Sequence, residues 1–388
     1  MINNIIFLIN SLSSGGAEKV LSVIVNELVN QGYKVEIIFL EKNEFYKLDN
    51  RVKKTYLSDF NGDESSIKKL LYIPVLAWRL KRYIKQNNIS LIQSHIFRAN
   101  YVNVLAKLFG SNHIVQVVTA GRISRYKELG FNGKINIWLI KYLYSKADLI
   151  ISKAQGMQED MQKLFNFNNK QIVINNPYDI KKIVALSKED ITDFVFDKNK
   201  RYLVSVGRLI PLKRNNELIN SLQYLANNIE VLFIGDGNQK DYLIDLTKQL
   251  NLEKRVHFLG QVDNPYKYMV KSDSFVSCSE SEGFPNVLVE AIICGVPVVS
   301  SDCVSGPREI LAPDTDINKQ LKKGENIELA KYGVLYPVGD VENLTKAIKL
   351  LVKNKNLKEK YSQFGLKRAN DFSVEKIIEK YKKVLLNG

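Results

Sequence analysis

The chain has 388 residues, of which 45% are apolar and 25% charged, and its formal net charge at pH 7 is +15. This composition excludes a disordered or fibrous chain, and the length exceeds what one hydrophobic core usually serves, so we expect two domains. No apolar run reaches the roughly 18 residues of a membrane-spanning helix, and the apolar start is too short for a secretory signal. We therefore expect an intracellular protein.

The positive charge is concentrated in the first half of the chain. Residues 1–190 hold 27 Lys and Arg against 16 Asp and Glu, a net charge of +11, and the remainder carries +4. A basic half favours an anionic partner, either nucleic acid or an anionic membrane surface, with a solvated lysine-rich surface as the alternative. The three cysteines form no C-x-x-C motif, so we expect reduced thiols rather than a disulfide or metal framework.

Short apolar strands alternate with amphipathic helices through the first half. The predicted strands cover residues 2–10, 35–40, 52–57, 89–94, 113–119 and 148–152. The predicted helices cover residues 17–29, 65–86, 99–109 and 134–146. Alternation of this kind indicates a parallel sheet with helices on both faces.

The second half repeats this architecture after a turn at residues 175–179 and a charged stretch. Its predicted strands cover 202–207, 231–235, 256–259, 274–278 and 296–300, followed by a polar insertion at 313–331 and helices at 341–352, 357–370 and 373–386. We expect an α/β protein with two doubly wound, Rossmann-like parallel sheets facing a cleft. The expected parts are an N-terminal domain over 1–178, a linker over 179–200, a C-terminal domain over 201–372, and a last helix, 373–388, that packs back on the N-terminal domain.

Ligands bind at the carboxyl ends of the strands in such sheets, so the loops there are the places to search for a site. Gly15 and Gly16 follow the first strand and precede a helix, where exposed amides attract a phosphate or carboxylate; a tight turn is the alternative. The loop matches neither a dinucleotide fingerprint nor a P-loop. Gly235-Asp236-Gly237 follows a later strand without a third glycine, and we interpret it as a turn.

Two cations follow the first strand of the second half. Arg208 lies just beyond the strand, and Lys213 comes five residues later, before a predicted helix. Together they suit a diphosphate, although ordinary surface charge is the alternative. Asp314-Thr315-Asp316 resembles a metal-binding D-x-D motif, but it lies in the late polar insertion, so we expect no metal site.

The strongest signal is the segment S-E-S-E-G-F-P-N-V-L-V-E-A at residues 279–291. Glu282 lies in the loop after a strand, and Asn286 is placed to cap a helix that carries Glu290 in its early turns. Carboxylates accept paired hydrogen bonds, which suits sugar and ribose hydroxyls. Acidic residues near a helix start also stabilise the helix dipole, so a structural role is the alternative.

Taken together, these motifs resemble the family-four retaining nucleotide-sugar glycosyltransferases of the GT-B fold. Glu282 and Glu290, with seven residues between them, match the family's signature. The first glycine loop and the Arg208–Lys213 loop match its other two landmarks in the expected order, so the resemblance covers essentially the whole chain. One departure is Arg214, which follows Lys213 where many relatives have glycine; it leaves the main roles intact and bears on loop shape.

The resemblance implies a retained anomeric configuration, no metal or other cofactor, and catalytic roles for Glu282, His95, Arg208 and Lys213. Arg208 and Lys213 would neutralise the leaving diphosphate near the Gly16 amide, and His95 ends a strand where relatives often carry a histidine at the sugar, a structural histidine being the alternative. Glu290 would hold the ribose hydroxyls, Glu282 and its loop the transferred sugar, and the backbone after residue 259 the base. The implied donor-binding residues are Gly15, Gly16, Arg208, Lys213, Gly260, Gln261, Val262, Glu282, Gly283, Phe284, Pro285, Asn286, Val287 and Glu290.

The acceptor side is expected in the first domain. A basic aromatic stretch over residues 67–85, interrupted by Pro74, suits an anionic lipid surface, with a core-packed helix as the alternative. Arg98, Arg122 and Arg125 are candidates for binding an anionic acceptor. S-G-P-R-E-I at 305–310 resembles a subset that builds bacterial surface polysaccharides, lipopolysaccharide O-chains or lipid-linked oligosaccharides, and this subset leans towards UDP-sugars.

We therefore expect transfer of a hexose or N-acetylhexosamine from a nucleotide sugar, UDP-linked, to a polyprenyl-diphosphate-linked saccharide. The expected location is cytoplasmic, with peripheral association to the anionic cytoplasmic face of the inner membrane and no nucleic-acid partner. A nucleotide-sugar 2-epimerase of GT-B architecture is the nearest enzymatic alternative. From another class, a basic nucleic-acid-binding protein would explain the charge, but the chain carries no nucleic-acid motif.

Overall fold

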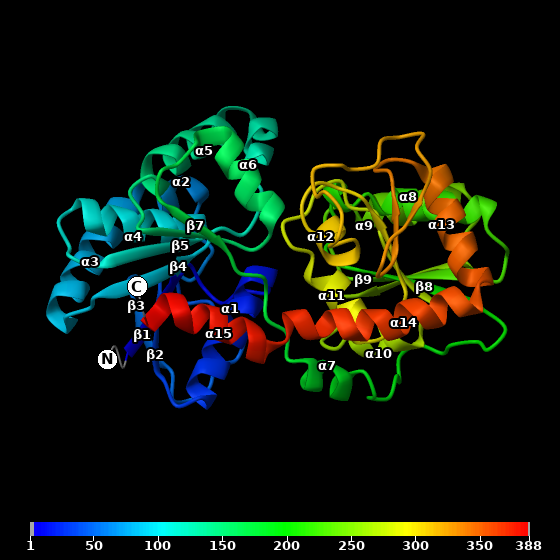
Figure 1. Ribbon diagram of the computed structural model, residues 1–388, viewed down its shortest axis with the longest axis horizontal. Coiled ribbons are helices and arrows are strands. Elements are labelled where there is room, and N and C mark those ends of the chain that lie inside the picture. Colours follow the sequence, from blue (N-terminus) through cyan, green and yellow to red (C-terminus); the bar gives the residue numbers. More distant parts are fainter. Residues whose placement is uncertain (1–3, 387–388) are drawn as a thin grey trace. The chain divides into compact units, whose positions relative to one another are not determined.

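Each half of the chain folds around a parallel sheet of its own, so the chain divides into two units. The computed structural model describes residues 4–386. Unit 1 comprises Met1–Pro177 and Val374–Gly388, and unit 2 comprises Tyr178–Ser373 (Figure 1). Residues 2 and 3 of the first predicted strand and residues 387–388 of the last predicted helix lie outside the described residues.

Unit 1 is built on a parallel sheet of seven strands in the order β3-β2-β1-β4-β5-β6-β7. Strand β1 pairs with β2 on one side and with β4 on the other, so the strand order reverses there. The loops after β1 and β4 flank this switch point, which is where open parallel sheets bind ligands. The strands are β1 Asn4–Ile9, β2 Lys34–Phe39, β3 Lys53–Tyr56, β4 Leu91–His95, β5 Ile114–Val118, β6 Leu149–Ser152 and β7 Lys170–Val173.

Helices cover both faces of this sheet because successive residues of each strand point to opposite faces. Ile6 and Leu8 of β1 pack in one apolar layer with α3, α4 and α5, while Phe7 and Ile9 pack in the other with α1 and α15. Figure 1 shows α15 beside α1. The helices are α1 Gly16–Asn30, α2 Ser66–Leu71, α3 Ile73–Asn87, α4 Phe97–Leu108, η1 Ser124–Leu129, α5 Gly130–Tyr144, α6 Gln155–Phe165 and α15 Val374–Leu386.

The basic stretch predicted as one helix forms two. Tyr72 ends α2 and precedes α3, and Pro74 takes a first-turn position of α3, where its missing N–H is not needed by the helix. Ser65 caps α2 by accepting a hydrogen bond from the Lys68 backbone N–H at 3.3 Å. The sequence prediction lacked α6 and β7, since β7 is a four-residue edge strand without a fully buried residue.

Unit 2 repeats the doubly wound arrangement, with strand order β10-β9-β8-β11-β12-β14-β13. All neighbouring strands are parallel except β13, which runs antiparallel to β14. The order reverses between β8 and β11, so the loops after these two strands flank the switch point. The strands are β8 Arg201–Val206, β9 Ile229–Ile234, β10 Val256–Gly260, β11 Ser274–Ser277, β12 Val298–Ser301, β13 Glu328–Leu329 and β14 Val334–Tyr336.

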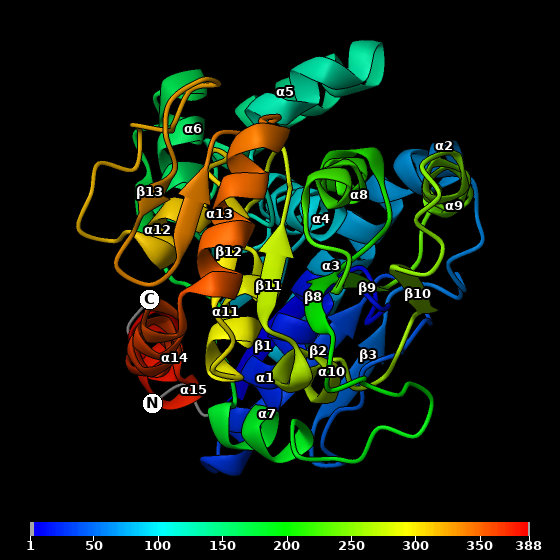
Figure 2. The ribbon, with the colours of Figure 1, turned by 90° about the vertical axis from the view of Figure 1, so that its right-hand side faces the viewer.

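The main apolar layer of unit 2 lies between the sheet and the helices α8 and α13. Figure 2 shows α13 lying across this face near β12. The helices are α7 Ile180–Leu186, η2 Pro211–Lys213, α8 Asn215–Ser221, η3 Leu222–Tyr224, α9 Lys240–Gln249, α10 Tyr266–Lys271, α11 Asn286–Ile293, α12 Pro307–Leu311, α13 Val341–Lys353, α14 Lys355–Ala369 and η4 Asn370–Phe372.

The predicted linker over residues 179–200 is wrong, because this stretch is part of unit 2. Helix α7 lies within it and packs against α10 and α11. The Tyr268 hydroxyl donates to the Asp193 carboxylate at 2.6 Å, and the ring of Phe196 packs against that of Tyr202. The charged composition suggested an exposed linker, but Asp193 ties the segment to α10 and Phe196 ties it to β8.

The three cysteines are free thiols, with Cys278 and Cys303 buried and Cys294 half-buried. Burial raises the pKa of the Cys294 thiol to about 12, so it is protonated at neutral pH. Over residues 4–386, none of the helices combines the length and apolar character needed to cross a membrane.

Candidate functional site

The loop after β8 presents the two predicted cations. Gly207, with φ +148°, turns the chain out of the strand. Arg208 is exposed, and in the described part of the chain its guanidinium has no hydrogen-bond or ion-pair partner. Lys213 ends η2, and its Nζ lies 2.5 Å from Oε1 of Glu282; the two side chains are 21% and 12% exposed. The structure therefore brings two distant predicted residues into one ion pair.

The loop after β11 is tied to the β8 loop along its length. The Glu280 backbone N–H donates to the Leu212 carbonyl at 2.9 Å. On either side of that bond stand the Lys213–Glu282 pair and an ion pair between Arg214 and Glu280, whose atoms are 3.3 Å apart. These polar contacts join the two loops that flank the switch point of unit 2.

Arg214, the departure from the family pattern, adopts a left-handed conformation with φ +47°. Glycine is favoured in that region because it lacks a Cβ. Here the arginine side chain offsets the cost by pairing with both Glu217 and Glu280. Burial raises the pKa of the Glu217 carboxyl, although the Arg214 guanidinium opposes that shift. The loop thus keeps a backbone shape suited to glycine and gains an ion-pair anchor.

Gly235 and Gly237 have a larger role than the turn predicted for them. A Cβ on Gly235, where φ is +135°, would lie 2.0 Å from the Gly207 carbonyl oxygen, and one on Gly237 would lie 2.3 Å from the Leu209 carbonyl oxygen. The Leu209 N–H donates to the Asp236 carbonyl at 2.9 Å. Two glycines directly after a strand were the available signal that the β9 loop packs tightly against the Arg208 loop.

Helix α11 carries the second signature carboxylate. Glu290 is buried, 3% exposed, and accepts a hydrogen bond from the Tyr266 hydroxyl at 3.4 Å. Asn286 does not cap the helix as predicted, because Pro285 occupies the capping position and Asn286 begins α11. Instead, Asn286 Oδ1 accepts a hydrogen bond from the Tyr178 hydroxyl at 2.6 Å.

The predicted base-binding backbone follows β10. Gly260 has φ +70°, and its carbonyl accepts a hydrogen bond from the Gly235 N–H at 2.7 Å. Gln261 is exposed and Val262 is half-buried. This turn is therefore tied through Gly235 to the tight packing of the Arg208 loop.

The S-G-P-R-E-I loop at residues 305–310 packs against the loop that carries Glu282. Ser305 Oγ donates to the Gly283 carbonyl at 2.7 Å. A Cβ on Gly306, where φ is +92°, would lie 2.3 Å from Cδ of Pro285. Arg308 is buried and pairs with Asp302. In the sequence, residues 305–310 stood out only because they resemble a subset of the family. In the structure this loop contacts Gly283 and Pro285, two of the predicted donor-binding residues.

In unit 1, the glycine loop ends at Gly15, the N-cap of α1, and Gly16 begins the helix. A Cβ on Gly15 would lie 2.2 Å from the Glu18 carboxylate, which also accepts a hydrogen bond from Ser13 Oγ at 3.1 Å. A carboxylate of the chain itself therefore lies at this helix start. A phosphate bound there would take the place of the Glu18 carboxylate.

His95 ends β4 on the other side of the same switch point and is 2% exposed. Burial, with a smaller effect of the Lys153 charge, holds the pKa of His95 well below its ordinary value, so the ring is neutral. Lys153 follows β6, and burial lowers its pKa to about 7. Its Nζ bonds the Tyr381 hydroxyl of α15 and lies 5.0 Å from the ring centroid. No sequence pattern singled out Lys153, because a lysine after a strand is usually exposed.

The three predicted acceptor arginines have different surroundings. Arg98 pairs with Glu41, and Arg122 lies 3.4 Å from Asp160. Arg125 is exposed, and over the described residues no partner of its side chain is found. Of the three, Arg125 is thus the one whose charge is most available to a ligand.

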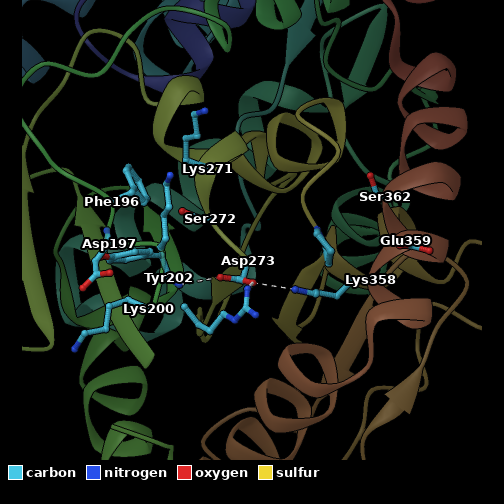
Figure 3. A pocket seen from close by; sticks show the side chains of 13 residues that line it. Phe196, Asp197, Lys200, Tyr202, Lys271, Ser272, Asp273, Lys358, Glu359 and Ser362 are labelled. Carbon is cyan, nitrogen blue, oxygen red and sulfur yellow. Dashed lines mark hydrogen bonds and ion pairs between the residues drawn. The ribbon is translucent and has the colours of Figure 1, made fainter. Parts of the chain in front are cut away.

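Unit 2 also has a pocket of about 420 Å³ at the amino ends of β8, β11 and β12, away from the predicted residues. Figure 3 shows Asp273 at its centre, where its carboxylate accepts from the Tyr202 N–H at 3.0 Å and pairs with Lys358 at 2.9 Å. Arg201 adds a contact of 3.5 Å. The central charges of this pocket already satisfy one another, so it is not the candidate site.

The described residues contain no group of three or more His, Cys, Asp or Glu side chains that could hold a metal ion. In the D-x-D-like segment, Asp314 instead pairs with Lys331 at 2.8 Å. The chemistry available at the candidate site is therefore that of two cations, two carboxylates and loop amides. Such a set can bind a diphosphate and orient hydroxyl groups.

Comparison with known proteins agrees with this geometry. Residues 187–368 match the model of glycosyl transferases group 1, and residues 14–182 match that of glycosyltransferase family 4. The chain is 30% identical, over 97% of its length and 98% of the relative's, to the N-acetylgalactosamine-N,N'-diacetylbacillosaminyl-diphospho-undecaprenol 4-alpha-N-acetylgalactosaminyltransferase of Campylobacter jejuni.

Solved structures share the fold at lower identity. HepE from Anabaena, in complex with UDP, aligns with a TM-score of 0.73 at 19% identity, covering 99% of this chain and all of that one. Sucrose-phosphate synthase from Thermosynechococcus elongatus aligns with a TM-score of 0.80 at 17% identity, covering 98% of each chain. The expected α/β fold with two doubly wound sheets is confirmed. The chain belongs to the family-four glycosyltransferases of the GT-B type, and its activity is glycosyl transfer.

Proposed function

We propose that the protein transfers a hexose or N-acetylhexosamine from a UDP-sugar, with retention of the anomeric configuration, to a polyprenyl-diphosphate-linked saccharide. The observation that carries this proposal is the Lys213–Glu282 ion pair at the switch point of unit 2, in the same loop as the exposed Arg208, whose guanidinium has no partner among the described residues. The Campylobacter relative acts on an undecaprenol diphosphate-linked saccharide, which supports the acceptor class. The product would be a lipid-linked intermediate of an O-antigen, capsule or related glycan.

On this proposal, the charges of unit 2 serve the departure of the diphosphate. Arg208 and Lys213 face the negative charge that builds on the leaving group and stabilise it without a metal ion. When the diphosphate binds, Lys213 pairs with it and the ion pair with Glu282 breaks. The Glu282 carboxylate can then accept hydrogen bonds from hydroxyls of the transferred sugar. Glu290 holds the ribose, and the backbone at Gly260–Val262 lies against the base.

In this mechanism no side chain acts as a nucleophile. The acceptor hydroxyl attacks on the face that the diphosphate leaves, and a phosphate oxygen of the leaving group takes the hydroxyl proton. In unit 1, the family resemblance implies that His95 contacts the transferred sugar and that the Gly16 amide contacts the diphosphate. Retention is tested by the NMR coupling of the new anomeric proton, which shows whether product and donor have the same anomer.

Exposed apolar side chains next to basic ones on unit 1 support peripheral binding to an anionic membrane. On α2 and α3, Ile67, Leu71 and Trp78 are 72%, 73% and 51% exposed, while the opposite face of α3 packs in the core. The Arg82 guanidinium lies 4.7 Å from the centroid of the Trp78 ring. Apolar anchors interleaved with cations suit a headgroup surface.

Flotation with vesicles tests this membrane contact. We expect the protein to float with vesicles that contain phosphatidylglycerol and not with vesicles of pure phosphatidylcholine. Trp78→Glu weakens the binding, whereas Tyr224→Glu, at a 65% exposed aromatic residue of unit 2, does not. Equal binding of wild type and Trp78→Glu contradicts the membrane face.

The donor site is tested by thermal unfolding in EDTA with UDP, GDP, ADP and their sugars. We expect UDP and UDP-sugars to raise the melting temperature of wild type and not that of Arg208→Ala. Arg201→Ala is the matched control, because Arg201 lies at the opposite end of β8. A response of Arg208→Ala equal to that of wild type contradicts the site, and stabilisation by GDP or ADP alone contradicts the uridine base.

A further inference from the structure

A line of buried polar side chains crosses an otherwise apolar layer of unit 1. Gln93 of β4 and Gln116 of β5 are 0% and 1% exposed, and they point to the face covered by α1 and α15. His95 lies two residues beyond Gln93 on the same face, with its ring against Phe7. Buried polar side chains weaken an apolar layer unless all their groups are bonded, so two amides and an imidazole in a line point to a task beyond packing.

Hydrogen bonds run through this line in one direction. Gln116 Nε2 donates to the Val384 carbonyl of α15 at 2.6 Å, and Gln93 Nε2 donates to Gln116 Oε1 at 2.8 Å. The direction is set by Val384, because a backbone carbonyl can only accept. Gln116 must therefore present its oxygen to Gln93, and Gln93 must present its own oxygen to His95.

This order determines the tautomer of His95. Its Nε2 lies 3.1 Å from Gln93 Oε1, which accepts, so Nε2 carries the hydrogen. A neutral imidazole has one N–H, which leaves a free lone pair on Nδ1. Across the described part of the chain, Nδ1 has no hydrogen-bond partner.

The backbone at His95 is also unusual. Ile96, the next residue, has φ +71°, a conformation that is strained for a β-branched side chain. Strain of this kind persists where the surroundings over-determine it, and it is typical of functional sites. Ile96 directly follows the carboxyl end of β4, and the predicted ligand-binding loops follow the carboxyl ends of the strands.

We propose that Gln93 and Gln116 are positioning residues that hold His95 as the Nε2–H tautomer, so that Nδ1 accepts a hydrogen bond from a hydroxyl of the transferred sugar. The sugar contact rests on the proposed function, but the tautomer does not. Helix α15 contributes to the orientation of His95, because the Val384 carbonyl sets the direction of all the hydrogen bonds in the line.

Nitrogen-15 NMR of labelled histidine tests the tautomer directly, because the chain has only three histidines. We expect His95 to show a protonated Nε2 and an unprotonated Nδ1 in the wild type. In Gln93→Leu and Gln116→Leu, we expect a mixture of tautomers, since nothing then orients the acceptor. A wild-type His95 protonated on Nδ1 overturns the proposal.

His113 provides a matched control within the same sheet. Its Nε2 faces Asn103 Oδ1 at 2.9 Å, so Asn103→Leu removes a comparable buried amide from a histidine that has no assigned role. We expect Asn103→Leu to alter the His113 signals and to leave both the His95 signals and transfer unchanged. Unaltered His113 and His257 signals show that the two glutamine variants are folded.

Kinetics then test whether the glutamines act through His95. We expect Gln93→Leu to lower kcat about tenfold with little change in donor KM, and to have no further effect in a His95→Ala background. An equal loss in both backgrounds means that Gln93 acts by another route and overturns the positioning role. An intact tautomer with full activity in His95→Ala overturns the sugar contact, separately from the donor site tested through Arg208.

Discussion

The switch points of the two sheets are built in opposite ways. In unit 2 the charged groups lie in loops and are partly exposed, and Lys213 and Glu282 satisfy each other across the β8 and β11 loops. In unit 1 the key side chain is buried at the end of a strand, and its orientation is fixed by a line of hydrogen bonds that ends on α15.

The difference shows two ways of preparing a binding group. An ion pair in a loop must exchange partners when a ligand arrives, so its strength and the ligand's compete directly. A buried histidine with a fixed tautomer presents its lone pair without rearrangement. The free-energy cost of burying its polar groups lowers the stability of the folded protein instead. Substitution of Lys213 or Glu282 should therefore act through the lost contact with the ligand, whereas substitution of Gln93 or Gln116 should lower turnover only through the orientation of His95.

The largest effect is expected from breaking the ion pair. Lys213→Met removes the charge at the diphosphate, and we expect kcat to fall about 1,000-fold. Glu282→Gln should cost about 100-fold, and the double variant little more than Lys213→Met, because the two groups act on one ligand. Steady-state kinetics of the four proteins measure this. Lys240→Met, which breaks an exposed pair with Asp236, is the control and should change neither kcat nor stability.

Independent, multiplicative losses in Lys213→Met and Glu282→Gln contradict the exchange of partners in unit 2. They would mean that the two residues bind separate parts of the donor throughout, so the pair seen here would have no part in the catalytic cycle.

The second effect tests how tightly the Arg208 loop is packed. Gly235→Ala places a Cβ 2.0 Å from the Gly207 carbonyl oxygen, and we expect a loss of about 3 kcal/mol in urea unfolding. Gly324→Ala is the matched control, because Gly324 has φ +90° but open space around it, so it should lose about 1 kcal/mol. Equal losses show that only backbone conformation matters and that the contact yields freely.

The sequence predicted most strands of both sheets and the loops that carry the candidate site. Those predictions rest on local patterns, namely buried apolar runs such as β9 and glycine or proline at turns, which need no knowledge of distant residues. Glu282 and Glu290 were singled out by the resemblance of their segment to the family's signature, and their contacts with the donor stay a prediction.

Three of the failures depend on tertiary partners. Residues 179–200 are charged enough to suggest a linker, yet Asp193 bonds Tyr268, 75 residues away. Asn286 suits a helix cap by type, but the Tyr178 hydroxyl, 108 residues away, takes its oxygen. Lys153 has a lowered pKa because it is buried, and its ammonium group bonds the Tyr381 hydroxyl, 228 residues away. No window of sequence contains these partners, so no local pattern predicts them.

The third effect concerns the buried charge of unit 1. The pKa of Lys153 falls to about 7 in the folded protein, below the usual lysine value, so between pH 7 and about 10 the unfolded chain binds more protons. Stability due to Lys153 therefore rises with pH across this window, by up to about 1.4 kcal/mol per pH unit, and is flat below it. Urea unfolding of wild type against Lys153→Met from pH 6 to 9.5 measures the difference. A constant difference shows that Lys153 stays charged in the fold.

The smallest effect separates a hydrogen bond from the backbone strain beside it. Ser305 has φ +69° and donates to the Gly283 carbonyl at 2.7 Å. Ser305→Ala keeps the strain and loses the bond, so we expect a loss of about 1 kcal/mol in urea unfolding. Ser305→Gly loses the same bond but relaxes the backbone, so its stability should stay near that of wild type.

Both variants should raise donor KM by the same few-fold factor, because each frees the Gly283 carbonyl that shapes the Glu282 loop. A KM that follows stability instead of the missing hydroxyl would show that the strain, and not the bond, positions that loop.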